Sequence, residues 1–256
     1  MVVRAAAPAG PEGLATVGSA RLWRRRLGLT ALGLLIAALV VVDLSMVLTP
    51  SVADAPARVA ALRSGHRGQS DAGRIPTRVG QAVLATEDSR FYRHPGIDVV
   101  AIGRALVAPL RSGIDPAGAT IDQQLAKLLY NPGRTGPVAV ARDAALAVKL
   151  DARYSKATLL AWYLDVAYFG DGAYGVQSAA RHYFAVPADQ LSWGQASMLA
   201  GLLQAPTAYD PVNHLHLARA RQAHVLQRLV ATGVLTKAEA ATAYAAPLIP
   251  AVRFAG

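Results

Sequence analysis

The sequence predicts an all-α protein preceded by an apolar segment long enough to cross a membrane, and three observations carry this prediction. The chain has 256 residues, of which 53% are hydrophobic but only 6% are aromatic. This alanine-rich composition favours helices packed through small side chains over sheets, which select β-branched and aromatic residues. After residue 50, helical periodicity alternates with short Gly and Pro breaks, and no stretch alternates as a sheet would.

Each helix is expected to begin where apolar helical spacing resumes. The expected starts are Pro56, Arg78, Asp98, Thr120, Val138, Lys156, Gly172, Gln190, Leu215 and Thr236. Gly and Pro interrupt the pattern at residues 115–118, 131–133 and 170–172. A chain of this length can bury one large core, so we expect a single helical domain.

The apolar segment covers residues 27–48 and would span roughly 33 Å as a helix, enough for the hydrocarbon core of a bilayer. Arg residues precede it, so residues 1–26 are expected to form a disordered cytoplasmic tail. We predict a single-pass signal anchor, a linker and juxtamembrane segment at 49–74, and an exported domain at 75–250. A cleavable signal peptide ending at residues 53–55 is the alternative, although the apolar run is longer than usual for one.

The net charge of +10 narrows the possible partners. Residues 1–50 hold five Arg against Glu12 and Asp43, so +7 of this charge belongs to the rest of the chain. A basic domain suits nucleic acid, anionic lipid headgroups or a phosphorylated substrate, and export argues against nucleic acid. The chain has no Cys and no His-Glu-x-x-His pattern, so we expect no disulfide and assign no metal ligand.

Glu87 is the first candidate for chemistry. The chain contains only two other Glu residues, Glu12 and Glu239, and Glu87 ends an apolar helical stretch. Partial burial beside Phe91 would raise the pKa of Glu87 and suit it to proton transfer. A helix cap or a surface ion pair is the alternative for an isolated Glu-Asp pair.

The pattern Glu-Asp-x-x-Phe-x-x-His-x-Gly occupies residues 87–96 and resembles the first signature of glycosyltransferase family 51, the peptidoglycan glycosyltransferases. Residues 117–127 are similar to the second signature and retain its Gln pair and its Lys. Residues 156–174 resemble the family's Lys-x-x-Ile-Leu-x-x-Tyr-Leu-Asn-x-x-Tyr-Phe-Gly block. The ordered matches extend over residues 75–245, which is nearly the whole of the expected exported part.

This resemblance implies a lysozyme-like, bilobal helical domain that polymerises lipid II. In the family, the 4-hydroxyl of the acceptor's N-acetylglucosamine attacks C1 of the donor's N-acetylmuramic acid, and undecaprenyl pyrophosphate leaves with inversion. Glu87 would be the general base and Asp143 the second catalytic carboxylate. The expected substrate-binding residues are Asp88, Phe91, His94, Gly96, Thr120, Gln123, Gln124, Lys127, Arg142 and Arg153. Of these, Lys127 and the two Arg residues would hold the donor pyrophosphate.

The resemblance also implies where the enzyme would work. The exported domain would lie outside the bacterial plasma membrane, with lipid II, the growing glycan strand, membrane lipids and cell-wall synthesis proteins as partners. Mg²⁺ at the donor pyrophosphate is the one cofactor that the resemblance allows. Residues 97–110 would dip into the bilayer, or form an ordinary core helix, since amphipathicity does not separate the two.

The third family signature, Arg-Lys-x-x-Glu, falls on residues 139–143 and is altered here. Both basic residues are missing, with Ala139 and Val140 in their places, and Asp143 is one methylene shorter than Glu. Arg142 lies nearly one helical turn after Ala139 and is the expected replacement. These changes leave two alternatives: a non-catalytic protein that binds lipid II or a cell-wall complex, and a lysozyme-like hydrolase.

The second signature departs from the family as well. Ala119 replaces Ser and Asp122 replaces Thr. Asp122 is expected to add negative charge near the pyrophosphate site.

Overall fold

The computed structural model describes residues 44–65, 75–107 and 118–248, together with residues 29, 30, 33 and 40. The chain divides into two units, residues 1–48 and 49–256. In the first unit, residues 44–48 are helical. Among the described residues, no helix has both the length and the hydropathy needed to cross a membrane. The predicted tail and most of the predicted anchor at 27–48 lie outside the described residues.

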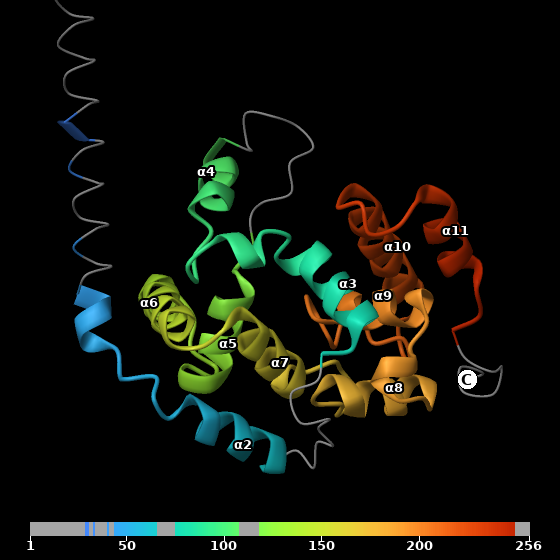
Figure 1. The fold of residues 1–256 in the computed structure, drawn as a ribbon, viewed down its shortest axis with the longest axis horizontal. Helices are drawn as coiled ribbons and strands as arrows, with labels where there is room; N and C mark the ends of the chain where they lie inside the picture. Colours follow the sequence, from blue (N-terminus) through green and yellow to red (C-terminus); the bar gives the residue numbers. More distant parts are fainter. Residues whose placement is uncertain are drawn as a thin grey trace, which may run out of the picture. The chain divides into compact units, whose positions relative to one another are not determined.

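The second unit confirms the all-α prediction for the residues that the structure describes (Figure 1). Its α-helices are α2 (Ala55–Gly65), α3 (Thr77–Glu87), α4 (Val99–Val107), α5 (Ile121–Tyr130), α6 (Pro137–Arg153), α7 (Lys156–Val166), α8 (Val176–Phe184), α9 (Trp193–Leu202), α10 (Leu215–Ala231) and α11 (Lys237–Ala245). Two short 3-10 helices, η2 (Phe91–Arg93) and η4 (Ala188–Gln190), join them. Extended pairing in this part of the chain is limited to one bridge between Tyr168 and Tyr174.

The helices pack in two groups. One group contains α3 and the other contains α5, and both of these helices contribute residues to the candidate site. Helix α3 packs on α9 and α10, and α11 packs on α10 (Figure 1). Helix α5 packs on α6 and α7, and α2 lies against α7 and α5. The core reaches back to Val52 and Val59, which are 5% and 2% exposed. Residues 49–65, predicted as part of a linker, therefore contribute to the packed domain.

Most helices begin within one residue of the start expected from the sequence, and several have a first turn capped by a side chain. Thr120, Ser192 and Thr236 each form a capping box with the Gln or Glu three residues later. This arrangement satisfies backbone N–H groups that have no partner inside the helix. The starts expected at Gly172 and Gln190 are wrong by four and three residues, since α8 begins at Val176 and α9 at Trp193. Positive φ angles at residues 170, 171, 172 and 175 make a turn there, closed by the bridge between Tyr168 and Tyr174.

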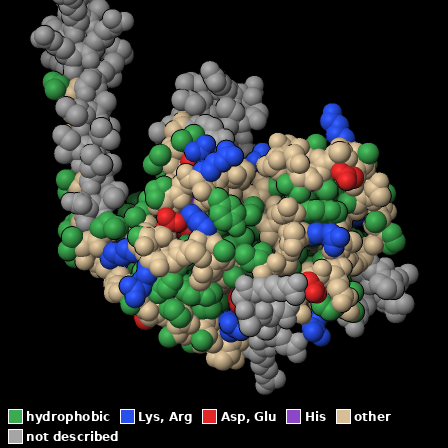
Figure 2. All heavy atoms as spheres, in the orientation of Figure 1, with side chains coloured by type: hydrophobic (Ala, Val, Ile, Leu, Met, Phe, Trp, Pro, Cys, Tyr) green, Lys and Arg blue, Asp and Glu red, His purple; other side chains and the backbone are tan. Residues whose placement is uncertain are grey.

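Apolar side chains also lie on the surface, and α4 carries several of them. Val99, Val100 and Ile102 are 72%, 46% and 47% exposed. In an ordinary core helix these apolar side chains would be buried. Over the described part of residues 97–110, the structure therefore does not show the core helix that was the alternative from the sequence. Figure 2 shows Lys and Arg side chains spread over the visible face rather than gathered in one patch.

Candidate active site

Glu87 is the last residue of α3, and its carboxylate is held by two other helices. Its side chain is 12% exposed. Gln124 on α5 donates a hydrogen bond from Nε2 to Glu87 Oε2 over 3.1 Å. Arg221 on α10 places its guanidinium 3.7 Å from Oε1. Burial raises the pKa of Glu87, while the Gln124 hydrogen bond and the Arg221 charge act against this rise.

Gln124 is itself fixed by a third helix. The hydroxyl of Tyr163 on α7 donates to Gln124 Oε1 over 2.6 Å. This bond leaves the Gln124 amide nitrogen to donate to Glu87 and to the carbonyl of Ala119. Burial raises the pKa of Tyr163 well above its usual range, so the hydroxyl keeps its proton and remains a donor.

Arg221 fits beside Glu87 because Gly201 leaves space for it. A Cβ at Gly201 would lie 3.0 Å from Arg221 Cγ. The side chain of Arg221 is 15% exposed, and its Nε has no hydrogen-bond partner among the described residues. One terminal nitrogen of the guanidinium therefore faces Glu87 while Nε stays buried behind it.

The residues after Glu87 turn the chain sharply. Asp88 caps the end of α3 and accepts the N–H of Ile121 over 3.1 Å, which ties α3 to the first turn of α5. Phe91 is 1% exposed and its ring packs edge-on against His94. Gly96 has φ +83°, and a Cβ there would lie 2.6 Å from the carbonyl oxygen of Ala147 in α6. Only Gly fits this position, because a side chain would meet backbone.

The second signature lies at the start of α5, and two of its residues cap this helix. Thr120 caps the helix and donates its hydroxyl to the Gly96 carbonyl over 2.7 Å. Gln123 completes the capping box by accepting the Thr120 N–H over 2.9 Å. Of this helix start, Gln124 contacts Glu87, whereas the side chains of Thr120 and Gln123 hold local structure.

A second group surrounds Asp143 at the junction of α5 and α6. Asn131 donates from Nδ2 to Asp143 Oδ1 over 2.9 Å. Burial raises the pKa of Asp143, and the Asn131 hydrogen bond, Lys127 and Arg142 oppose the rise. Lys127 is exposed on α5, and Arg142 is half-buried with its Nε unpaired among the described residues. Arg153 does not join this group: it is exposed at the end of α6, over the ring of Tyr154.

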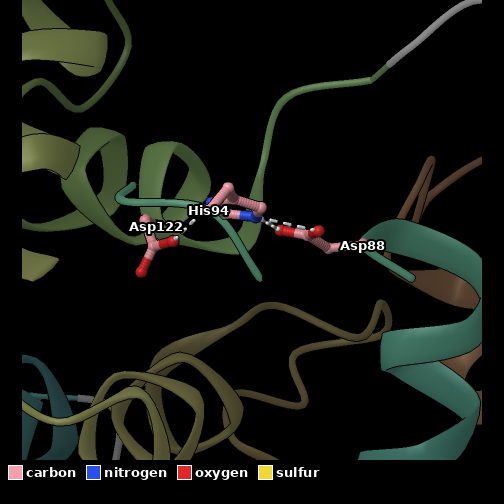
Figure 3. A group of neighbouring side chains, drawn as sticks. All are labelled: Asp88, His94 and Asp122. Atoms are coloured by element: carbon pink, nitrogen blue, oxygen red, sulfur yellow. Dashed lines mark hydrogen bonds and ion pairs between the residues drawn. The ribbon is translucent and has the colours of Figure 1, made fainter. Parts of the chain in front are cut away.

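The structure corrects the expectation for Asp122. Its side chain is fully buried and points towards His94, and Lys156 lies 2.7 Å from its Oδ2 (Figure 3). Burial raises the pKa of Asp122 to about 6, against the opposing effect of Lys156. The Asp122 carboxylate is thus paired with Lys156 inside the domain. The sequence had predicted instead that it would add negative charge near the pyrophosphate site.

Sequence reasoning missed three residues that hold the candidate carboxylates. Arg221 and Tyr163 contact this site from α10 and α7, more than 30 residues from Gln124. Tyr163 belongs to the block at 156–174 that resembles the family, but the block alone assigns it no partner, and no local pattern marks Arg221. Asn131 was noted only as part of a helix break. A polar residue directly after a helix that faces a buried acid is the signal that could have identified it.

Comparison with known proteins identifies the family. Residues 56–230 match the family model described as Transglycosylase. Penicillin-binding protein 2a of Streptococcus pneumoniae is 40% identical over 163 residues, which cover 64% of this chain and 22% of that protein. Penicillin-binding protein 1A of Aquifex aeolicus is 39% identical over 176 residues, which cover 68% of this chain and 24% of that protein. The chain thus spans about a quarter or less of the length of these two relatives.

A shorter relative is matched over most of its length. A Cupriavidus necator protein named "Putative transglycosylase" is 37% identical over 176 residues, which cover 69% of this chain and 76% of that protein. The family model and this relative agree with the signatures that surround Glu87 and Gln124. The chain belongs to the transglycosylase family.

Proposed function

We propose that this protein is a peptidoglycan glycosyltransferase that polymerises lipid II, with a lysozyme-like, bilobal domain anchored outside the bacterial plasma membrane. One observation carries the proposal. Glu87 is a largely buried carboxylate, 12% exposed, with a raised pKa at the end of α3, and three other helices fix its surroundings. This arrangement suits a general base that must be ionised, correctly aimed and poorly solvated.

In the proposed reaction, Glu87 accepts the proton of the acceptor's 4-hydroxyl as that oxygen attacks C1 of the donor. The bond from C1 to the pyrophosphate oxygen breaks, and undecaprenyl pyrophosphate leaves with the electron pair. Gln124 holds one oxygen of Glu87, so the other faces Arg221 and the acceptor. Arg221 keeps the carboxylate ionised before the transfer, because a nearby positive charge favours the charged form.

The leaving pyrophosphate needs positive charge, and Lys127 and Arg142 can supply it. Lys127 lies on α5 one turn beyond Gln124, and its exposed ammonium is free to reach a donor. Arg142 lies on α6 beside Asp143, with an unpaired buried Nε. Mg²⁺ would fit beside Asp143 if the pyrophosphate supplied its other ligands, since Mg²⁺ is usually bound by one or two carboxylates and substrate phosphates. It would neutralise charge on the leaving group.

A specific observation favours a second candidate, a protein that binds lipid II without turnover. Ala139 is buried and Val140 is 61% exposed at the two positions where the family signature has basic residues. The charge available to a leaving pyrophosphate is therefore reduced on α6. Binding through Lys127 and the exposed apolar face of α4 would survive this loss.

Incubation of the full-length protein in detergent with labelled lipid II tests both candidates and the hydrolase alternative. Glycan polymer from the parent protein, none from Glu87→Gln and normal polymer from Glu239→Gln would support the proposal. Glu239 is a matched control because Gln also completes a capping box at its position. Binding of lipid II without polymer would establish the non-catalytic candidate instead. Shortening of preformed glycan would establish a hydrolase.

A further inference from the structure

His94 lies between two buried carboxylates. It comes from the turn after α3, Asp88 from the end of that helix, and Asp122 from the first turn of α5 (Figure 3). The His94 side chain is 3% exposed, and those of Asp88 and Asp122 are 4% and 0% exposed. One ligand atom from each residue lies within 4.8 Å of the other two. The transglycosyl transfer described above assigns no chemistry to Asp122.

The bond from His94 to Asp88 fixes which ring nitrogen carries the proton. Nε2 lies 3.0 and 3.1 Å from the two Asp88 oxygens. An ionised carboxylate can only accept a hydrogen bond, so Nε2 must donate. In the neutral ring this leaves Nδ1 with a lone pair. A carboxylate that orients a His in this way is the usual second partner of a metal-binding imidazole.

The free lone pair of His94 faces a second unpaired atom. Neither His94 Nδ1 nor Asp122 Oδ1 has a hydrogen-bond partner among the described residues. Nδ1 lies 3.8 Å from the other Asp122 oxygen, Oδ2, which is too far for an N–H···O bond. Two ligands of one tetrahedral Zn²⁺ lie roughly 3.4 Å apart, as the bond lengths of about 2.1 Å require. His94 Nδ1 and Asp122 Oδ1 thus both lack a partner among the described residues, in a cluster whose ligand atoms lie within 4.8 Å of one another.

The charges that face His94 leave negative charge in excess. Asp88, Asp122 and Asp151 are opposed by the ammonium of Lys156, which lies 2.7 Å from both Asp122 and Asp151, and by Arg93, which lines the pocket beside His94. Asp98 is already paired with Arg90 over 2.9 Å. Because Lys156 takes only Asp122 Oδ2, the Oδ1 atom stays available. An unpaired oxygen on a buried carboxylate costs free energy unless a cation binds to it.

A surface pocket reaches His94, one member of this cluster. A pocket of about 450 Å³ is lined by His94 and Lys156 together with Tyr92, Arg93, Pro95, Asp151, Tyr154 and Ser155. Its walls come from the η2 turn and from the junction of α6 and α7. Water in the pocket can complete the coordination of an ion that has only a few protein ligands.

From these observations we propose a binding site for a divalent transition metal, with His94 Nδ1 and Asp122 Oδ1 as ligands and Asp88 as the group that orients the imidazole. Imidazole nitrogen with carboxylate oxygen suits Zn²⁺ and Co²⁺, and no Cys competes elsewhere in the chain. The bound ion would tie the turn after Glu87 to α5. No local pattern indicates this site, because its ligands lie 28 positions apart and Asp122 replaces an uncharged residue of the family signature.

Zinc titration of the full-length protein in detergent, after removal of metal by a chelator, tests the site directly. We expect one Zn²⁺ per chain, a first shell of nitrogen and oxygen in X-ray absorption, and a rise in Tm of about 5 to 10 °C at a hundredfold excess over Kd. Asp122→Asn should weaken binding at least about tenfold, since even groups outside the ligand shell change affinity by about 10 to 100. Asp151→Asn is the matched control, because it removes the same charge from the same Lys156 without removing a ligand.

Each result decides the proposal. Zinc affinity that falls in Asp122→Asn but not in Asp151→Asn would support it. Equal affinity in both variants would place the ion on surface His residues such as His182, His214 or His216 and overturn the proposal. If the Tm of the parent protein does not change with Zn²⁺ but changes with pH, a proton on His94 neutralises the two carboxylates and the proposal is overturned. Because binding and Tm are measured without lipid II, these outcomes are independent of transferase activity.

Discussion

Glu87 and Asp143 are the two candidate catalytic carboxylates, and they are held in different ways. Glu87 is contacted from α5 and α10, and α7 reaches it through the Tyr163 bond to Gln124. Asp143 accepts a hydrogen bond from Asn131, only 12 residues earlier, at the junction of α5 and α6. The setting of Glu87 therefore depends on long-range packing, and that of Asp143 on two consecutive helices.

The departures from the third family signature fall on the side that depends less on packing, whereas Asp122, a departure from the second signature, is buried in the domain. Val140 points mostly into solvent, so its loss of charge disturbs no buried contact. Around Glu87, in contrast, the contacts depend on one another. Tyr163 holds Gln124, Gln124 holds Glu87, and Arg221 faces the same carboxylate. A region built from mutual contacts resists substitution, whereas an open helix end can change without unfolding the domain.

The largest effect should come from removing the base. Glu87→Gln keeps the shape of the side chain but cannot accept the proton, so we expect polymerisation of lipid II to fall by about 10² to 10⁴. Rates of glycan formation on labelled lipid II measure this loss. Glu239→Gln should leave the rate unchanged, and a Glu87→Gln rate near the parent's would remove Glu87 from the chemistry.

A large effect on stability is expected at Gly96, the residue that joins the two regions through Thr120 and Ala147. Gly96→Ala forces a side chain into a positive φ and against the Ala147 carbonyl. We expect a loss of about 2 to 5 kcal/mol in the free energy of unfolding. Denaturant unfolding measures it. Gly118→Ala is the control, since no atom lies within 4 Å of its added Cβ, and equal stability of the two variants would contradict the close approach.

A smaller loss of activity is expected at Asp143. Asp143→Asn removes a charge that faces Lys127 and Arg142 but leaves the base intact. Losing a charged hydrogen-bonding partner costs about 1.5 to 3 kcal/mol, or about 10- to 100-fold in rate. Asp189→Asn, on an exposed position of η4, should have no effect. A loss as large as that of Glu87→Gln would show that the two carboxylates share the proton transfer.

The smallest effect is a shift in pH dependence. The base must be ionised, so activity should fall as pH drops through the raised pKa of Glu87. Arg221→Gln removes a charge that favours the ionised form, so the pKa rises further and the acid limb of kcat/KM moves to higher pH. The variant therefore loses more activity at low pH than at high pH. Arg219→Gln removes the same charge two residues away and should keep the parent profile, and an unmoved limb in Arg221→Gln would rule out this coupling.

The helices and the signatures could be predicted from the sequence because they depend on local rules. Apolar spacing and caps such as Thr120 placed α5 correctly, and Pro137 starts α6 one residue before the expected Val138. The break at residues 170–172 was predicted from its Gly residues, but the helix after it was expected at Gly172 and begins at Val176, because the turn extends to Gly175, which also has a positive φ.

The sequence by itself determined the fold class, the family and the positions of Glu87, Gln124 and Lys127, since short-range spacing carries all of these. Only the tertiary structure decided which residues surround each carboxylate. It brought Arg221 and Tyr163 to Glu87, used Gln123 for a helix cap, set Arg153 apart, and enclosed Asp122 with His94 and Lys156. The physical reason is that burial and the charges of distant neighbours set both the pKa and the aim of a carboxylate, and no local pattern encodes which neighbours arrive.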